Sequence, residues 1–173
     1  SKALRGSKTL RQYTNQMNEF AQKGDLQGAT RWMNHIRRRG LTPDRAVFTT
    51  MIHACAEASR QDEAARWFAK LEAAGHEADV VAYTAMVRAC AKCGNSVGAD
   101  AWFRRMEQNG IEPTMQTWTI MLNAYAIDQD KSEVNILGLL DRMNRAGVKP
   151  TLVMFNTVID NAARSGVASS DQS

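Results

Sequence analysis

Threonine returns along this chain of 173 residues at a fixed interval of 35, at Thr14, Thr49, Thr84 and Thr119. A second polar column follows at Asp44, Asp79, Thr114 and Thr151. Hydroxyls donate and accept hydrogen bonds, whereas carboxylates only accept them. Threonine is also a mediocre helix former, so its fourfold return needs a physical cause. The chemistry of these columns is hydrogen bonding, either to a bound molecule or to the backbone at the start of a helix.

Residue groups typical of catalysis or metal binding are incomplete. Cys90 and Cys93 form a lone C-x-x-C, without the second pair of ligands that a structural zinc site needs. The three histidines fall at unrelated places, and no Ser/His/Asp set or Gly-rich phosphate loop is implied. Residues 128–133, DQDKSE, look like the start of a calcium loop but lack its sharp-turn Gly and its final Glu. We therefore expect no enzymatic activity, no metal and no cofactor, and we expect Cys90 to pack in the core.

The two polar columns belong to a longer internal repeat. Two further columns have the same spacing of 35: Trp32, Trp67 and Trp102, and the aromatic residues Tyr13, Phe48, Tyr83 and Trp118, each just before a Thr. A Gly column, Gly40, Gly75, Gly110 and Gly147, recurs at intervals of 35, 35 and 37. The chain divides into four full repeats, 10–44, 45–79, 80–114 and 115–151, and a half repeat, 152–166. A basic segment, 1–9, precedes them, and a polar tail, 167–173, follows.

Each repeat contains two helical patterns. In the third repeat the first stripe holds Tyr83, Met86, Val87, Cys90 and Ala91, and the second holds Ala99, Trp102, Phe103 and Met106. The Gly that follows suits the left-handed residue that closes a helix, and the next Asp or Thr can cap the helix after it. No hairpin can bury its stripe alone, so the hairpins must stack. We predict an all-α fold, an α-solenoid of helix–turn–helix hairpins that winds as a right-handed superhelix.

The half repeat has an apolar stripe with no second helix of its own. The stripe consists of Phe155, Val158, Ile159 and Ala162. It could cap the stack, but we favour the interpretation that the natural chain continues beyond residue 173. Self-association through this stripe is a further alternative. The chain opens with Ser, as a processed protein or an excised domain would.

The net charge of +4 is unevenly placed. Residues 1–44 hold nine Lys and Arg against three Asp and Glu, a balance of +6, and the remaining thirteen against fifteen give −2. The cations gather in Lys2, Arg5, Lys8, Arg11 and the run 37–39. Such a cluster attracts phosphates, although helix ends also carry Arg for their own stability. No apolar run approaches 18 residues, which excludes a membrane span, and three cysteines without a disulfide framework favour a reducing compartment.

The 35-residue hairpin resembles the pentatricopeptide repeat, as in VVAYTAMVRACAKCGNSVGADAWFRRMEQNGIEPT, residues 80–114. The tetratricopeptide repeat has a period of 34 and another Trp, Gly and Tyr pattern. The resemblance covers residues 10 to about 166. The fourth repeat departs from it by two extra residues, which we place in the turn at 127–133.

The resemblance implies that each repeat reads one base of single-stranded RNA with two or three side chains. The reading pairs would be Thr14 with Asp44, Thr49 with Asp79, Thr84 with Thr114, and Thr119 with Thr151, and Asn156 would begin a fifth. The base-flanking residues would be Arg11, Ala46, Val81, Gln116 and Val153. Candidate phosphate contacts are Arg88, Lys92, Lys8 and Arg5.

Helix geometry places the Thr column beside the buried face and not within it. Packing on a half-buried stripe could nevertheless explain these threonines, and capping alone could explain Asp44, Asp79, Thr114 and Thr151. By resemblance, Thr with Asp favours guanine, so the first two repeats would prefer 5′-GG.

The function that the resemblance implies is non-catalytic RNA binding in a mitochondrion or plastid, in RNA processing, stability or translation. The alternatives are a protein-interaction scaffold of the same fold, such as a subunit of an organellar ribosome or processing complex, and the RNA-binding arm of a larger enzyme.

Overall fold

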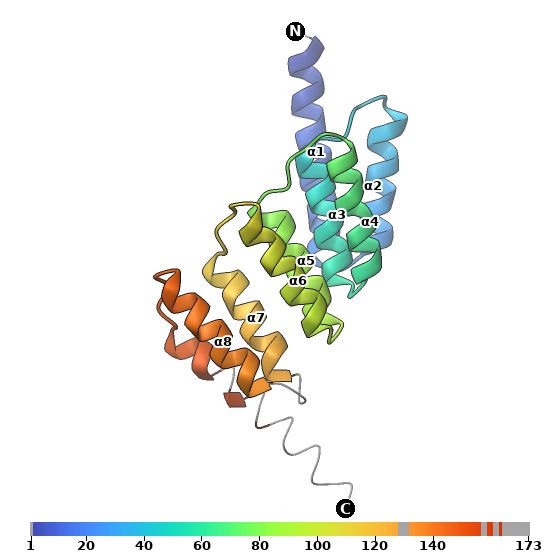
Figure 1. Cartoon of the computed structure of the whole chain (residues 1–173). Helices are drawn as coiled ribbons and strands as arrows, with labels where there is room; N and C mark the ends of the chain where they lie inside the picture. Colours follow the sequence, from blue (N-terminus) through green and yellow to red (C-terminus); the bar gives the residue numbers. More distant parts are fainter. Residues whose placement is uncertain (1, 128–131, 157–158, 161–162, 164–173) are drawn as a thin grey trace, which may run out of the picture.

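The computed structural model of this chain describes residues 2–127, 132–156, 159–160 and 163, and in these ranges it is built from helices without any strand (Figure 1). In chain order the helices are α1 (Lys2–Gln22), α2 (Leu26–Arg38), α3 (Arg45–Glu57), α4 (Gln61–Ala73), α5 (Val80–Lys92), α6 (Ser96–Gln108), α7 (Met115–Ile127) and α8 (Ser132–Arg145). Residues 152–156 are also helical. The all-α prediction is confirmed.

The repeat boundaries agree with the period of 35. Helices α3, α5 and α7 begin at Arg45, Val80 and Met115, and each is 13 residues long. The first helix is longer than expected, because α1 begins at Lys2 and thus includes nearly all of the segment that we placed before the first repeat. The turn at 127–133, with its two extra residues and the rejected calcium loop, lies largely outside the described residues.

Glycine and the second polar column mark the turns between repeats. Gly40, Gly75, Gly110 and Gly147 all have positive φ, between 67° and 78°, which is the left-handed conformation that glycine adopts without strain. The side chains of Asp44 and Asp79 accept hydrogen bonds from the backbone N–H groups of Val47 and Ala82. The hydroxyls of Thr114 and Thr151 accept equivalent bonds from Thr117 and Met154. These four residues therefore cap the helices that follow them, as the sequence predicted.

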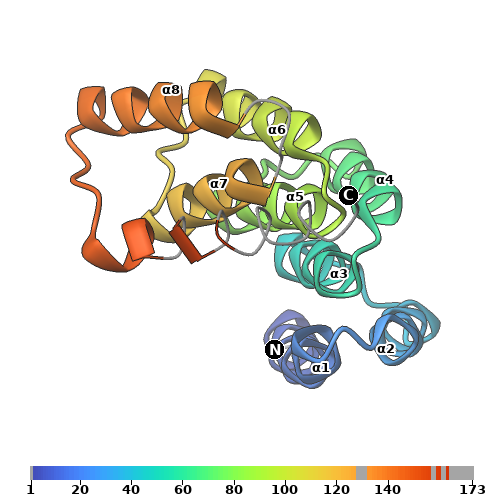
Figure 2. The same ribbon diagram turned by 90° about the horizontal axis from the view of Figure 1, so that it is seen from below.

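The hairpins stack so that, within the described residues, each contacts its neighbours in the chain and no other hairpin. Helix α3 packs against α1 and α5, α5 packs against α7, and each of the second helices α2, α4 and α6 packs against the first helix of the next repeat. Seen from below, α1, α3, α5 and α7 form an inner row and α2, α4, α6 and α8 an outer one (Figure 2). The first helices thus line the concave face of the stack.

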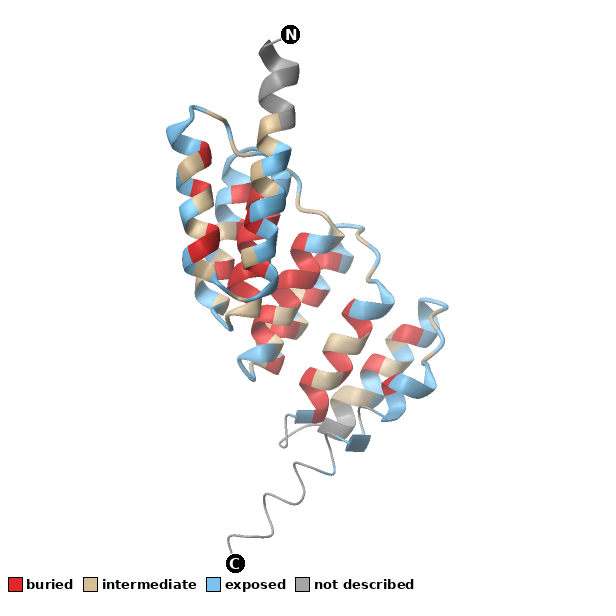
Figure 3. Ribbon diagram, turned by 180° about the vertical axis from the view of Figure 1, so that it is seen from behind, coloured by how far each residue is buried: buried red, intermediate tan, exposed pale blue. Residues whose placement is uncertain are grey.

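The core follows the stack as a band of buried residues between the two rows (Figure 3). The Trp residues pack inside their own hairpins, where the ring centroids of Trp32, Trp67 and Trp102 lie 5.6, 6.4 and 6.4 Å from those of Tyr13, Phe48 and Tyr83. Cys55 and Cys90 are buried, and their burial raises the pKa of the thiols to about 12 and about 11. The predicted packing role of Cys90 is confirmed, and the three Trp residues are half-buried against the aromatic residues of their own hairpins.

Ion pairs tie consecutive second helices together on the outer row. Arg105 donates to Glu72 at 2.6 Å, and one period later Arg142 donates to Glu107 at 2.6 Å. Both guanidinium groups also lie over aromatic rings, Arg105 over Trp102 and Arg142 over Phe103. At the boundary between the first and second repeats the equivalent residues are Arg37 and Lys70, which carry the same sign. The same register therefore stabilises the later boundaries but not this one.

Candidate nucleic-acid interface

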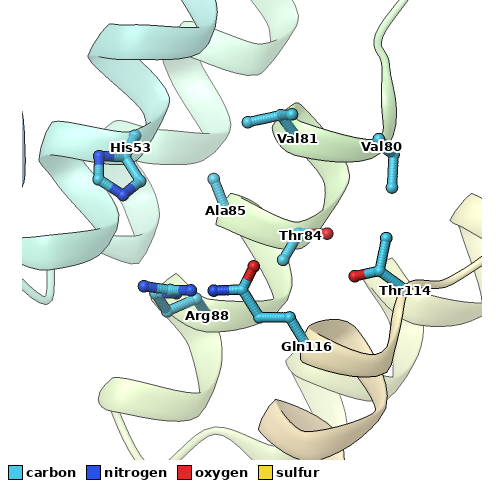
Figure 4. Close-up of a pocket in the computed structure, with 8 residues that line it drawn as sticks. All are labelled: His53, Val80, Val81, Thr84, Ala85, Arg88, Thr114 and Gln116. Atoms are coloured by element: carbon cyan, nitrogen blue, oxygen red, sulfur yellow. The ribbon is translucent and has the colours of Figure 1, made fainter. Parts of the chain in front are cut away.

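A cavity of about 200 Å³ opens between α3, α5 and α7 on the concave face. Its lining residues are His53 from α3, Val80, Val81, Thr84, Ala85 and Arg88 from α5, and Thr114 and Gln116 from the start of α7. In Figure 4 the side chains of Thr84, Thr114 and Gln116 lie on one side and His53 lies opposite, with Arg88 between. The structure therefore brings together a predicted reading pair, two base-flanking residues and one candidate phosphate contact.

The Thr column is more deeply placed than the sequence suggested. Thr49 and Thr84 are only 8% and 7% exposed, so the prediction of a stripe outside the buried face is wrong for these two. Thr14 and Thr119 are half-buried. The difference arises because successive first helices pack side by side and cover part of this stripe, a contact that the period within one helix does not reveal.

The hydroxyls of the four threonines differ in their hydrogen bonds. Thr14 and Thr119 donate to backbone carbonyls of their own helices, those of Leu10 at 2.9 Å and Met115 at 2.8 Å. Thr84 bonds the hydroxyl of Thr117 at 2.9 Å. The hydroxyl oxygen of Thr49 is buried and has no partner within the described residues. The column is uniform in sequence, but among these four threonines the Thr49 hydroxyl alone forms no hydrogen bond with a described residue.

Unpartnered polar atoms recur on the first helices. Besides the Thr49 hydroxyl, Nδ1 of His53 and Oδ1 of Asn123 are buried and lack partners within the described residues. His53 and Asn123 occupy equivalent positions two repeats apart. Burying such groups costs about 1–3 kcal/mol each, and a polar ligand in the concave face would offset that cost.

The base-flanking residues are accessible. Val81 is 53% exposed, and Arg11, Ala46, Gln116 and Val153 are exposed as well. Only Val81 and Val153 offer the flat apolar surface against which a base would pack. Among the reading partners, Asp79 has its carboxylate 3.5 Å from Nε of Arg45, which balances part of its charge.

The candidate phosphate contacts on α5 are already engaged by an acid. Glu57, at the end of α3, accepts hydrogen bonds from Arg88 at 2.8 Å and from Lys92 at 2.5 Å, and Nε2 of His53 lies 3.7 Å away. Sequence reasoning missed Glu57, although its place one period before Lys92 was a usable signal. For Arg5 and Lys8, the structure describes only the helix that carries them.

The contacts within this cluster shift the pKa values of Glu57 and His53. Burial alone would raise the pKa of Glu57, but hydrogen bonds from Lys92 and Arg88 outweigh it and hold the pKa below its usual value. Burial lowers the pKa of His53, and the nearby Glu57 opposes that shift only in part. At neutral pH the cluster therefore holds two cations against one carboxylate, with a neutral imidazole beside them.

The half repeat exposes part of its apolar stripe. Of the stripe, Phe155 and Ile159 are 43% and 62% exposed, while Val158 and Ala162 lie outside the described residues. Asn156, which would begin a fifth reading pair, is exposed. None of the helices in the described part of the chain is long and apolar enough to cross a bilayer, and no group of three metal-binding side chains occurs there.

Comparison with known proteins gave a family match and several structural matches. A family model described as the pentacotripeptide-repeat region of PRORP matches residues 2–170. No curated protein matches the chain.

Among solved structures, the pentatricopeptide repeat protein PPR10 from maize has a TM-score of 0.79 at 23% identity, over 90% of this chain and 22% of that one. PPR10 in complex with an 18-nt psaJ RNA element has a TM-score of 0.78 at 23% identity, over 88% and 22% of the two chains. The PPR domain of Arabidopsis thaliana protein-only RNase P 1, in complex with tRNA, has a TM-score of 0.70 at 15% identity, over 90% and 81%. These likenesses confirm the solenoid fold, and the chain spans less than a quarter of the PPR10 chain.

Proposed function

Because this chain belongs to the pentatricopeptide repeat family, we propose that its concave face binds single-stranded RNA and that each repeat reads one base. The observation that carries the proposal is the cavity between α3, α5 and α7. Thr84, Thr114 and Val81, which the sequence placed in three separate columns, line this one cavity together with Gln116.

The chemistry of the cavity suits a base edge. Hydroxyls can donate to or accept from the edge of any base, and Val81 supplies an exposed apolar surface beside them. Sequence-specific recognition of RNA uses unstacked bases that are packed against side chains and hydrogen-bonded at their edges. The pairs Thr14 with Asp44 and Thr49 with Asp79 would then favour guanine, so that the first two repeats prefer 5′-GG.

We propose that the chain binds RNA without transforming it, in RNA processing, stability or translation in a mitochondrion or plastid. The cations of the first 44 residues would hold phosphates at the amino end, where the +6 balance is concentrated. If the chain is part of a longer protein, this solenoid would be its RNA-binding arm.

A protein-interaction scaffold is the second candidate, and the Glu57 cluster favours it. Arg88 and Lys92 lie on the concave face but are paired with Glu57, and residues 45–173 carry a balance of −2. A groove with such paired cations attracts phosphates less than a basic one does. A protein partner would meet a nearly neutral concave surface.

Fluorescence anisotropy with short single-stranded RNAs separates the two candidates. The RNAs carry GG, AA, CC or UU at two adjacent positions and are titrated at two salt concentrations against wild type and the double variant Thr14→Ala/Thr49→Ala. Thr50→Ala is the matched control, since Thr50 adjoins Thr49 but donates to its own helix at Ala46. RNA reading predicts a preference for GG that the double variant loses and the control keeps.

Other outcomes would contradict base reading. Equal, salt-sensitive binding to all four RNAs would mean that only the basic amino end acts. No binding at low salt would exclude RNA recognition by these repeats and leave the scaffold.

A further inference from the structure

We infer that Thr117, which belongs to neither reading column, determines which hydrogen bonds Thr84 and Thr114 offer to a base; the inference rests on the proposed function. Thr117 is the third residue of the fourth repeat and is 0% exposed. The equivalent residues of the second, third and fifth repeats are Val47, Ala82 and Met154, all buried and apolar. A buried hydroxyl at this position is therefore particular to one repeat and needs a partner to be stable there.

Thr117 joins the two reading hydroxyls into one network. Its hydroxyl lies 2.9 Å from that of Thr84 and 3.0 Å from that of Thr114. The backbone N–H of Thr114 donates to the same oxygen at 3.3 Å, and the N–H of Thr117 donates to the Thr114 hydroxyl at 3.3 Å. The two links thus connect α5 with the start of α7 at the wall of the cavity.

The network limits which hydrogen-bond donors and acceptors Thr84 and Thr114 can offer to a ligand. The Thr117 oxygen has one proton and two lone pairs, and the Thr114 N–H occupies one lone pair. Thr117 can therefore donate to one reading hydroxyl only while it accepts from the other. The hydroxyl that donates to Thr117 has only lone pairs left for a base, and the other keeps its proton. The pair presents one donor and one acceptor, and their order reverses when the protons rotate together.

The neighbouring reading pair lacks such a link. One period before Thr84 and Thr117 stand Thr49 and Ala82, and the Thr49 hydroxyl has no partner within the described residues. Its partner Asp79 can only accept hydrogen bonds. The Thr49 and Asp79 pair therefore offers a donor and an acceptor in fixed order, which selects among bases. The Thr84 and Thr114 pair, with its reversible order, tolerates all four.

Helix capping explains only part of the role of Thr117. Its two bonds with Thr114 match the reciprocal bonds of a capping box. The bond to Thr84 is not part of that motif, because it joins residues 33 positions apart on different helices. This bond is what connects the cap to the reading column.

Substitution of Thr114 by Asp makes the inference testable. In Thr114→Asp, the new carboxylate must accept from Thr117, so Thr117 must accept from Thr84, and Thr84 loses its donor. In the double variant Thr114→Asp/Thr117→Ala, Thr84 keeps its proton, and the site copies Thr49, Asp79 and Ala82. Thr114→Asp/Thr117→Ser is the matched control, because serine restores the hydroxyl at the same buried position.

The assay is anisotropy with two sets of four RNAs, one varied at the base read by the second repeat and one at the base read by the third. Circular dichroism confirms that each variant is folded. For wild type, we expect the affinities for the four RNAs varied at the third position to differ by no more than about threefold. For Thr114→Asp/Thr117→Ala, we expect the base preference at the third position to equal that of wild type at the second position. In Thr114→Asp and in the serine control, the affinity ratio between the preferred base and the others should be about tenfold smaller, because one buried hydrogen bond is left unmade.

The second-repeat RNAs separate the two proposals. If wild type discriminates there but Thr114→Asp alone already matches that preference, Thr117 has no influence and the inference fails while base reading stands. The inference also fails if the Thr117→Ala double variant gains no preference. If wild type binds none of the RNAs, or does not discriminate at the second position, base reading itself fails and the inference fails with it.

Discussion

Replacing Glu57 by Gln would release the two cations of the concave face. Glu57 holds Arg88 at 2.8 Å and Lys92 at 2.5 Å, and Gln keeps the size of the side chain while removing its charge. Each phosphate neutralised on a single strand contributes about 0.7 to the slope of log affinity against log salt. Two released cations should therefore steepen that slope by about 1.4 and tighten RNA binding at 0.1 M salt by roughly tenfold or more.

The assay is RNA affinity measured across a series of salt concentrations. Glu107→Gln is the matched control, because it removes the same charge from an ion pair with Arg142 on the outer row. We expect its salt slope to equal that of wild type. An unchanged slope in Glu57→Gln, or an equal increase in both variants, would refute the idea that Glu57 competes with phosphate for Arg88 and Lys92.

The same substitution has a consequence for pH. The pKa of Glu57 is lowered in the folded protein, chiefly by Lys92 and Arg88 against an opposing effect of burial. A lowered carboxyl pKa adds stability above the ordinary pKa of the unfolded chain, and that stability is lost as the pH falls through the folded value. Urea unfolding should therefore show a smaller loss of stability below about pH 4.5 in Glu57→Gln than in wild type.

Three further predictions concern stability and reactivity. Arg37→Glu should supply the missing partner of Lys70 and raise the free energy of unfolding by about 0.2–1 kcal/mol in urea titrations; a decrease would contradict the register of the outer ion pairs. Gly110→Ala should lower it by about 1–2 kcal/mol, because Gly110 has a φ of 71° while its surroundings leave room for the methyl group. Cys93 is exposed, whereas burial raises the pKa of Cys90 to about 11. Iodoacetamide at pH 8 should therefore modify Cys93 before Cys90, as followed by mass spectrometry, and equal rates of modification would show that Cys90 is accessible.

Local sequence signals were sufficient to predict the turns between the second and third and between the third and fourth hairpins, but not the start of α1 at Lys2. Gly75 and Gly110 end two second helices and Asp79 begins the next first helix, and each signal depends only on backbone preferences that act within a few residues. Five residues of the cavity, Val81, Thr84, Arg88, Thr114 and Gln116, were named from the family resemblance, whereas His53, Val80 and Ala85 were not among the predicted site residues.

The features that the sequence predicted wrongly or missed depend on contacts between repeats. The burial of Thr49 and Thr84 follows from the way in which adjacent first helices pack, and the period within one helix does not specify that arrangement. The pairing of Glu57 with Arg88 and the link from Thr117 to Thr84 have the same origin, since both join residues more than 30 positions apart.

The stacking order also has a consequence for cooperativity. In the part of the chain that the structure describes, each hairpin contacts its neighbours alone, so the first and fourth repeats influence each other through those between them. In this chain α3 and α5 each pack between two other first helices, so their protection from hydrogen exchange should exceed that of α1. A strand of RNA along the concave face would connect distant repeats directly, so the ligand would provide the long-range coupling that the protein lacks.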